Sequence, residues 1–283
     1  MRELLTIRKE VSPATRWTLA FVSWAVVVAI WTILTHWDIV NHFSVPTPLE
    51  VVRAFPQLWT ESELVRNVST SWWRIAQAFL WCVAIALPLG LLMASFRWLN
   101  SLIDPVAAPM RSMPLTAFLP AFIGLFGIGE TMKIAFLWFG MFFYLLAVVV
   151  EEVNRVDQSL LETAYTLGAK RRQVLWLMFR ASIPGVFSSF RILYDIGWTY
   201  VILAEIVNRQ KGVGAMVQSA EQFHRPDLVY AGIIAIGFAA FLFRMLLTLL
   251  ERQLFPWRRV AAQVSAGSIP TASAHLKAVK HGS

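Results

Sequence analysis

Long apolar stretches separated by polar connections are the feature that most constrains the fold of this chain. A helix needs about 20 apolar residues to cross a bilayer. Stretches of about that length cover residues 17–37, 72–96, 103–126, 132–150, 186–207 and 228–250. Only 15% of the residues are charged, against about a quarter in soluble domains. The sequence therefore predicts an all-α membrane protein with six transmembrane helices.

The remaining segments divide the chain into three predicted regions. Residues 1–16 form a polar N-terminal segment, and residues 17–259 form the transmembrane domain. Residues 260–283 are rich in Ala, Ser, Thr, Lys and His without periodicity, which predicts a disordered tail. The first apolar stretch has full length and lacks a small-residue cleavage site, so we expect no cleavable signal peptide.

Lys and Arg are distributed unevenly between alternate connections. With the N-terminus in the cytoplasm, the inner segments hold fifteen of these residues and the outer segments hold six. This asymmetry satisfies the positive-inside rule, and it explains the formal charge of +8 better than binding to nucleic acid does. We therefore expect both termini and the polar segment 151–184 to be cytoplasmic.

The sequence offers little support for catalysis or for a bound cofactor. The sequence has a single cysteine, Cys82, which lies in an apolar stretch. One cysteine excludes an intrachain disulfide and a CxxC metal site. The histidines show no ligand spacing, and no GxxxxGK[ST] phosphate loop occurs. We predict a protein that is not an enzyme and holds no metal or cofactor of its own.

The longest polar interruption runs from Glu151 to Pro184, with acidic residues in its first half and basic residues in its second. Ser159 is predicted to cap a helix there, with Glu162 as its capping-box partner. Apolar residues follow at helical spacing: Leu160, Leu161, Ala164, Tyr165 and Leu167. Gly168 ends this helix in the left-handed conformation, and a second helix runs from about Lys170 to just before Pro184.

The polar segment 151–184, with two predicted helices joined at Gly168, has two interpretations. The segment is either a docking element for a soluble partner or an ordinary solvated loop. We favour docking, because a loop that needs only solubility has no use for a capped helix with an apolar face.

The pattern Glu162-Thr163-Ala164 with Gly168 four places on resembles the EAA loop of ABC importer permeases. In that family the first helix is the coupling helix, which sits in a cleft of the ATPase subunit. Thr163 replaces the first Ala of the motif, and Arg180 and Ala181 stand where Leu and Pro are usual. The coupling residues implied by the resemblance are Ser159, Leu160, Glu162, Thr163, Ala164, Leu167, Gly168, Lys170 and Arg171.

The resemblance extends from Val45 to Trp257. The stretches SVPTPLEVV, RSMPLTAFLP, FGIGETMKI and AEIVNRQKGVGAMVQSAEQFHRPDLVYAGI are similar to the nitrate/sulfonate/taurine/bicarbonate branch of binding-protein-dependent permeases. This implies a type I importer fold in a bacterial inner membrane and a permease homodimer. It also implies two cytoplasmic ATPase subunits, which bind ATP and magnesium, and an extracytoplasmic binding protein that delivers solute.

Two alternatives remain for the class of solute, and two for the energy source of transport. The resemblance implies a small anion such as a sulfonate, taurine, nitrate or bicarbonate, with heteroaromatic vitamin precursors as the alternative. The rival class is an ion-coupled secondary transporter, which predicts internal repeats and intramembrane acidic residues. Asp195 and Glu205 are the candidate acidic residues, and we detect no repeat.

The third apolar stretch is the better candidate for solute passage, because prolines at 105, 109, 114 and 120 interrupt it. Such breaks are tolerated where backbone lines a cavity or is buried in protein, so helix packing is the alternative. The candidate path residues in this stretch are Arg111, Met113, Leu115, Thr116 and Phe118.

The fifth stretch adds Arg191, Asp195, Trp198, Tyr200 and Glu205 to the candidate path. Arg191 and Asp195 are four residues apart and can pair on one helical face. They either line the path, with Arg191 attracting an anion, or form a buried structural pair. The two aromatic residues either line the path or pack. The resemblance favours architectural roles for Arg191 and Glu205.

A further polar connection surrounds Gly212 and Gly214 and resembles the family's periplasmic loop, which faces the binding protein. Residues placed to contact that partner are Asn208, Arg209, Lys211, Glu221, His224 and Arg225. The alternative is an ordinary solvated loop.

Overall fold

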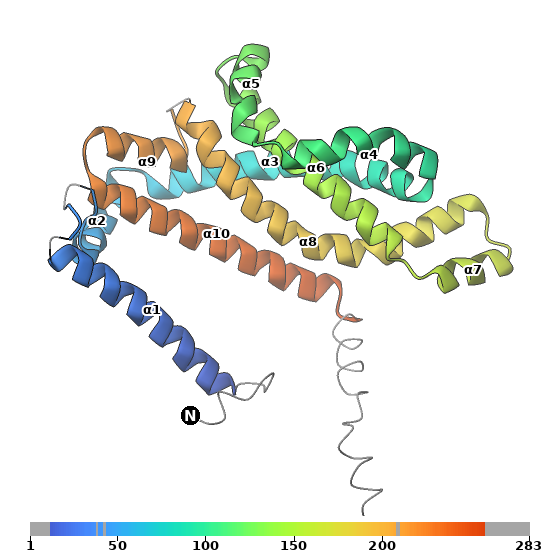
Figure 1. Cartoon of the computed structure of the whole chain (residues 1–283), viewed down its shortest axis with the longest axis horizontal. Helices are drawn as coiled ribbons and strands as arrows, with labels where there is room; N and C mark the ends of the chain where they lie inside the picture. The colour runs from blue at the N-terminus through green and yellow to red at the C-terminus, as the bar shows by residue number, and fades with distance from the viewer. Residues whose placement is uncertain (1–11, 38, 42–43, 208–209, 258–283) are drawn as a thin grey trace, which may run out of the picture. The chain divides into compact units, whose positions relative to one another are not determined.

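A computed structural model describes residues 12–37, 39–41, 44–207 and 210–257, and every regular element in these ranges is a helix (Figure 1). The elements are α1 (Pro13–His36), α2 (Pro48–Thr60), α3 (Leu64–Ser95), α4 (Arg97–Ser112), η1 (Leu115–Phe118), α5 (Leu119–Phe126), α6 (Glu130–Asn154), α7 (Gln158–Thr166), α8 (Arg171–Val207), α9 (Val213–Gln222) and α10 (Pro226–Leu254). The predicted all-α fold is confirmed. Most of the predicted N-terminal segment and the predicted tail 260–283 lie outside the described residues.

Four of these helices, α1, α3, α6 and α10, are long and apolar enough to cross a membrane. The helices Arg97–Ser112 and Leu115–Phe126 form a bent pair that adds a fifth span if it is counted as one. The chain breaks between them at Met113 and Pro114, as Pro114 predicts. The predicted breaks at the other prolines are wrong, because Pro105 and Pro109 lie inside α4 and Pro120 lies in the first turn of α5, where a missing N–H does no harm. The expected fifth stretch, 186–207, lies inside α8, which is less apolar because Arg191 and Asp195 interrupt it. Its role as a sixth span stays a prediction.

The short helix α2 begins as the sequence predicts. Thr47 Oγ1 accepts a hydrogen bond from the amide of Glu50 (3.3 Å), and Glu50 Oε2 accepts one from the amide of Thr47 (2.8 Å). Pro48 occupies the first turn, where a missing N–H does no harm. This capping box contributes about 1 kcal/mol to helix formation.

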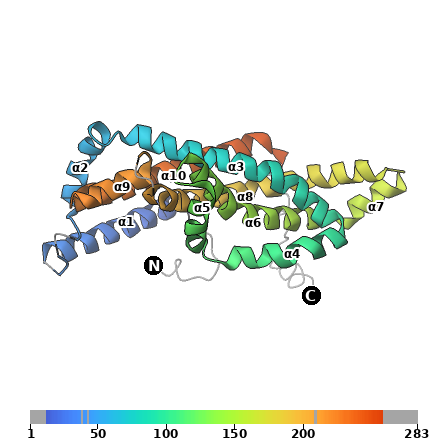
Figure 2. The ribbon, with the colours of Figure 1, turned by 90° about the horizontal axis from the view of Figure 1, so that it is seen from above.

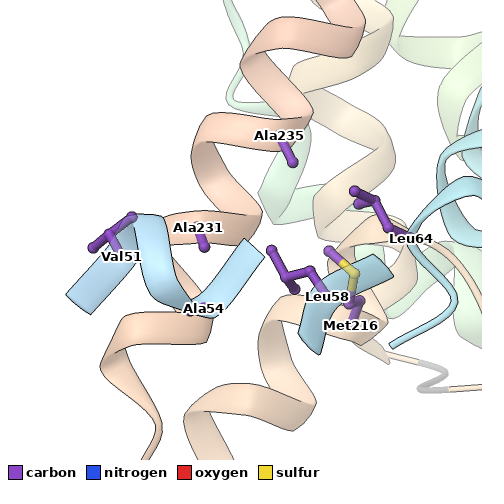
Figure 3. Close-up of a cluster of buried hydrophobic side chains, with 7 residues drawn as sticks. All are labelled: Val51, Ala54, Leu58, Leu64, Met216, Ala231 and Ala235. Carbon is purple, nitrogen blue, oxygen red and sulfur yellow. The ribbon is translucent and has the colours of Figure 1, made fainter. Parts of the chain in front are cut away.

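The chain divides into two compact units. The first consists of Met1–Ala76, Leu119–Phe136 and Thr199–Ala239, and the second of Gln77–Phe118, Leu137–Trp198 and Ala240–Ser283. In the first unit, α2 packs its apolar face against α9, the start of α10 and the start of α3 (Figure 3). The buried side chains of this cluster are Val51, Ala54, Leu58, Leu64, Met216, Ala231 and Ala235. Burying one large side chain such as Leu58 stabilises the unit by about 1.5–3 kcal/mol.

Helix α1 belongs to the first unit and leaves most of its apolar surface exposed. Its attachment is near its end, where Trp31 Nε1 donates to the carbonyl of Pro46 (3.0 Å) and the indole lies 6.0 Å from the Tyr230 ring. Trp17 and Trp37, one near each end of the helix, are 79% and 68% exposed. An exposed apolar surface of this length is suited to lipid contact.

The second unit packs α6 against α3 and α8. A Cβ on Gly90 of α3 would lie 2.6 Å from Val149 Cγ1, and a Cβ on Gly185 of α8 would meet the side chain of Glu152. The rings of Phe79 and Phe190 meet edge to face at 4.9 Å and join α3 to α8. Small residues thus let three helices approach closely.

Candidate functional site

Helix α7 lies at the tip of the hairpin formed by the end of α6 and the start of α8 (Figures 1 and 2). Asp157 caps its N-terminus, since Asp157 Oδ1 accepts from the amide of Ser159 (3.0 Å). The predicted cap at Ser159 is therefore wrong by two residues. A carboxylate directly before the helix meets the orphan amides first and also complements the positive end of the helix.

The helix ends at a glycine elbow, as predicted. Gly168 has φ +79°, a conformation that glycine adopts without strain. Its amide donates to the carbonyl of Tyr165 (2.9 Å), and the amide of Ala169 donates to that of Ala164 (3.0 Å). Together these bonds form the Schellman arrangement, which satisfies the last carbonyls of α7 and fixes the exit direction of the chain.

The surface of α7 is unusual for a helix of nine residues. None of its residues is buried, and even its large apolar side chains are exposed: Leu160 by 41% and Tyr165 by 57%. Leu167, just beyond the end of the helix, is 82% exposed. Other predicted coupling residues, including Glu162, Thr163, Lys170 and Arg171, are also exposed, and Ala164 is half-buried. Leu160 and Leu167 are seven residues apart and so lie on one side of the helix, whereas Tyr165 lies on another. Exposed apolar side chains on one side of a helix that buries none of its residues are suited to contact with a partner.

The helix after the elbow is longer than the sequence predicts. It begins at Arg171, where the amide of Lys170 donates to Gln173 Oε1 (2.7 Å), and continues through Pro184 to Val207. The predicted stop before Pro184 is wrong. Proline removes one backbone hydrogen bond, but transmembrane helices tolerate this loss where neighbouring groups pack around the break. Pro184 is buried, and its carbonyl accepts a bond from Ser188 Oγ (2.9 Å).

The helix before α7 is also anchored. Arg155 in the loop after α6 bonds Glu151 (2.6 Å) and Glu152 (2.5 Å), which closes the last turn of α6. Because Gly185 of α8 lies against Glu152, the helices on both sides of α7 are packed together within the second unit. A force on α7 therefore acts on two joined helices.

Arg191 and Asp195 each have a partner on α10. Arg191 lies 3.3 Å from Glu251 and also bonds Thr248 Oγ1 (3.4 Å), while Asp195 bonds Arg244 (2.7 Å). The sequence instead predicts an ion pair between Arg191 and Asp195, because helical spacing shows only neighbours on the same helix. These contacts between α8 and α10 support the structural interpretation of both residues.

The candidate path residues of the third apolar stretch differ in exposure. Met113 is 44% exposed, Thr116 is exposed and Arg111 is half-buried, whereas Leu115 is buried. Phe118 is half-buried against Phe139, with ring centres 5.1 Å apart. The stretch thus contains both solvent-facing and packing residues.

The candidate residues of α8 fall in both units. Trp198 is buried in the second unit against Phe243 (6.2 Å) and Tyr194 (6.3 Å), which supports packing. Tyr200 is half-buried and Glu205 fully buried in the first unit. The candidates of α8 are therefore divided between the two units.

Glu205 lies in a buried polar network of the first unit. Its Oε1 accepts from Ser71 Oγ (2.6 Å) and Arg74 Nη1 (2.7 Å), and its Oε2 accepts from the amide of Gly214 (2.9 Å). Arg74 also bonds both carboxylate oxygens of Glu130 (2.6 Å each). The buried ammonium of Lys133 lies 3.2 Å from Glu130.

The same network holds the segment that leads into α9. Arg74 Nη1 donates to the carbonyl of Lys211 (2.8 Å), and the amide of Val213 donates to Ser71 Oγ (2.9 Å). Side chains of α3 and α8 thus cap the first amides of α9, which has no cap of its own because residue 212 is glycine. The network orients α9 on the first unit.

The predicted outer loop contains this helix, which the sequence does not reveal. Lys211 and Arg225 line a cavity of about 500 Å³ that Glu61, Glu63 and Phe223 also line. The hydrogen bond from Arg225 to Asp227 raises the pKa of Arg225. Glu221 and His224 are exposed, and the predicted contact residues Asn208 and Arg209 lie outside the described residues.

Comparison with known proteins gives this arrangement a family. Residues 86–260 match the model described as "Binding-protein-dependent transport system inner membrane component". The chain belongs to this family. It is a multi-pass inner-membrane permease of a binding-protein-dependent importer, and its role is transport and not enzymatic catalysis.

Relatives of this permease are found among sulfonate transporters. It is 32% identical to the taurine transport system permease protein TauC of Escherichia coli, over 85% of this chain and 90% of the relative. It is 31% identical to the putative aliphatic sulfonates transport permease protein SsuC of Bacillus subtilis, over 83% and 85%. The predicted sulfonate and taurine branch is confirmed.

The fold agrees with a solved importer. An inward-facing structure of the MetNI methionine ABC transporter has a TM-score of 0.61 at 18% identity, and the match covers 70% of this permease and 97% of that chain. At this identity the likeness concerns the fold alone, and it confirms the expected type I importer fold.

Sequence reasoning missed Arg74, Glu130 and Lys133 of this permease. Arg74 lies inside an apolar stretch, and a charge in such a stretch is expensive enough to signal a buried partner. The identity of the partners depends on contacts between distant helices, which one sequence does not show.

Proposed function

We propose that α7 is the coupling helix through which this permease receives motion from an ATPase subunit. The carrying observation is that α7 buries none of its residues and exposes Leu160 and Tyr165, with Leu167 exposed directly after its end. Its elbow is fixed by the backbone hydrogen bonds after Gly168, and it leads directly into α8. A rigid element with an exposed apolar surface is suited to a cleft in a partner.

The proposed assembly contains two copies of the permease, two cytoplasmic ATPase subunits and an extracytoplasmic binding protein. ATP and magnesium bind to the ATPase subunits. The N-terminus, the C-terminus and α7 lie on the cytoplasmic side, in keeping with the excess of basic residues there. Closure of the ATPase pair carries α7 and the helices packed beside it as a rigid body, which opens the permease toward the binding protein. Hydrolysis resets it.

The proposed solute is a small sulfonate of the kind named for the relatives TauC and SsuC. Arg111 supports this proposal, because it lines a cavity of about 420 Å³ and has no ion-pair partner among the described residues. Asp104, Glu151 and Arg155 also line this cavity. A guanidinium binds a sulfonate oxygen pair through parallel hydrogen bonds.

Among the candidate path residues, we assign the path to Arg111, Met113 and Thr116. Their side chains are accessible, whereas Leu115, Trp198 and Glu205 are buried in the described chain. The other four candidates are assigned to packing and ion pairing, because each has a partner within the chain. They are Phe118, Arg191, Asp195 and Tyr200, and the partners of the first three are Phe139, Glu251 and Arg244.

The coupling proposal is tested with Leu167→Asp, at the residue that directly follows α7. We expect the variant to insert normally but to lose copurification with the ATPase subunit and the stimulation of ATP hydrolysis by the loaded binding protein. Phe223→Asp is the matched control for copurification with the ATPase subunit, because Phe223 is 79% exposed and lies outside α7. Normal ATPase binding by Leu167→Asp would contradict the proposal.

The solute proposal is tested separately. The partner binding protein is titrated by calorimetry with taurine, longer alkanesulfonates, nitrate, bicarbonate and pyrimidines. We expect binding of a sulfonate, and binding of pyrimidines alone would favour the heteroaromatic alternative. Arg111→Ala is expected to reduce uptake of the bound solute at least tenfold without changing ATPase docking.

A further inference from the structure

An apolar groove of about 850 Å³ opens between α3 and α8 in the second unit. The residues that line it on α3 are Val83, Ala84, Leu87, Pro88 and Leu91. The residues that line it on α8 are Arg172, Gln173, Leu175, Trp176 and Phe179. None of these lining residues is acidic.

The two walls of the groove differ in polarity. The α3 wall belongs to a helix that is long and apolar enough to cross a membrane, so we place this wall in the hydrocarbon layer. The α8 wall begins at Arg172, which directly follows Lys170 and Arg171. These three basic side chains are exposed, and none has an ion-pair partner among the described residues. An apolar wall is thus joined to uncompensated positive charge.

Trp176 marks the boundary between these two environments. Its side chain is 54% exposed, its ring stacks on Phe179 at 5.3 Å, and the guanidinium of Arg180 lies 5.2 Å from its centre. Tryptophan is enriched where the bilayer meets water, and arginine beside it reaches the lipid headgroups. The groove therefore spans from headgroup level into the apolar layer.

We propose that this groove binds one anionic phospholipid of the bilayer. An acyl chain lies along Val83 to Leu91, and the phosphate contacts Arg172. Basic pockets between transmembrane helices on the cytoplasmic side suit anionic headgroups. A phosphate also supplies the counter-charge that Arg172 lacks.

A second copy of the chain is the competing occupant. An apolar helix of that copy laid into the groove would bury Arg172 without a counter-charge, which is unfavourable. The phospholipid avoids this cost, because its headgroup stays at the level of Arg172 while its acyl chain covers the apolar wall. The charge of the groove therefore favours the lipid.

The experiment measures lipid retained by the purified full-length permease, without ATPase subunits, by native mass spectrometry. The probes are phosphatidylglycerol and phosphatidylcholine with the same acyl chains. We expect the permease to retain phosphatidylglycerol preferentially, and Arg172→Ala to weaken that retention about fivefold, because one basic residue near an anionic surface contributes about 1 kcal/mol. Retention of phosphatidylcholine should not change.

Two further variants make the result specific. Arg53→Ala is the matched control, because Arg53 is an exposed arginine of α2 outside the groove, and it should retain both lipids normally. Leu87→Trp should fill the groove and reduce retention of both. Arg172→Gln, which keeps a long polar side chain, should repeat the loss seen with Arg172→Ala.

Either of two results would overturn the proposal. One is equal phosphatidylglycerol retention by the Arg172 variants and by Arg53→Ala. The other is efficient crosslinking of Leu87→Cys between two copies of the permease in phosphatidylglycerol nanodiscs, which would assign the groove to the second copy. Lipid retention needs no ATPase, so failure of the coupling proposal would leave this result unaffected, and only the choice of leaflet depends on the proposed orientation.

Discussion

Arg74 Nη1 lies 2.7 Å from Glu205 Oε1, and their side chains are only 3% and 0% exposed. The pair joins α3 to α8 within the first unit, and it also reaches the segment that begins α9 through the carbonyl of Lys211 and the amide of Gly214. A buried ion pair of this kind makes the two residues depend on each other.

Removing one partner of this pair should destabilise the permease strongly. We expect Arg74→Ala to lower the free energy of unfolding by about 3–5 kcal/mol, because it leaves the Glu205 carboxylate buried without its guanidinium. The double variant Arg74→Met/Glu205→Gln should recover part of the loss. Thermal unfolding in detergent measures both, and equal melting temperatures for the single and double variants would contradict this prediction.

Gly212 should not tolerate a side chain. Its φ is +117°, and an added Cβ would lie 2.2 Å from Glu205 Cδ. We expect Gly212→Ala to displace the start of α9 and to make the first unit more sensitive to limited proteolysis. Gly124→Ala is the control, because no atom lies within 4 Å of the Cβ that it would add. Equal proteolysis of the two variants would count against the described contact.

Substitutions of Gly168 should act through the backbone conformation that they allow and not through side-chain volume. Open space surrounds the position, so Gly168→Asn should be nearly neutral, and Gly168→Ala should cost about 1–2 kcal/mol locally. Gly168→Pro removes the amide that bonds Tyr165 and cannot adopt a positive φ. We expect it to insert normally and to abolish stimulated ATP hydrolysis, and Glu162→Lys in α7 to do the same. Normal stimulation in the proline variant would show that the elbow is not required.

Arg191 should act on stability and not on solute affinity. It contacts Glu251 and Thr248 of α10, so Arg191→Ala should reduce the free energy of unfolding by roughly 1.5–3 kcal/mol. The KM for solute uptake should stay unchanged in the reconstituted importer. A large rise in KM with an unchanged melting temperature would instead place Arg191 in the path.

The sequence predicts local features of this permease well. Apolar length locates the helices, Thr47 with Glu50 predicts the start of α2, and Gly168 predicts the elbow after α7. Each of these features depends on residues close together in the chain. The prediction for α8 failed at Pro184, because the packing that supports a proline inside a membrane helix comes from elsewhere in the fold.

Contacts between residues far apart in the chain could not be predicted from the sequence. The partners of Arg191 and Asp195 lie on α10, and the network of Arg74 combines residues more than 50 positions apart. The helix α9 was also missed, since its first amides are capped by Ser71 and Glu205 from other helices. Glycines at 212, directly before the helix, and at 214, in its first turn, also disfavour a helix start in the sequence. A single sequence records spacing but not which distant segments meet.

The absence of a side chain at Gly185 has a consequence for engineering. Because the space beside it is filled by Glu152, the end of α6 and the middle of α8 must be exchanged together if either is replaced. If α7 has the proposed coupling role, a chimaera that grafts only residues 157–169 from another permease should change the choice of ATPase and keep the contact between Gly185 and Glu152. A graft that replaces only one of the two helices, α6 or α8, combines surfaces that no longer fit at Gly185 and Glu152.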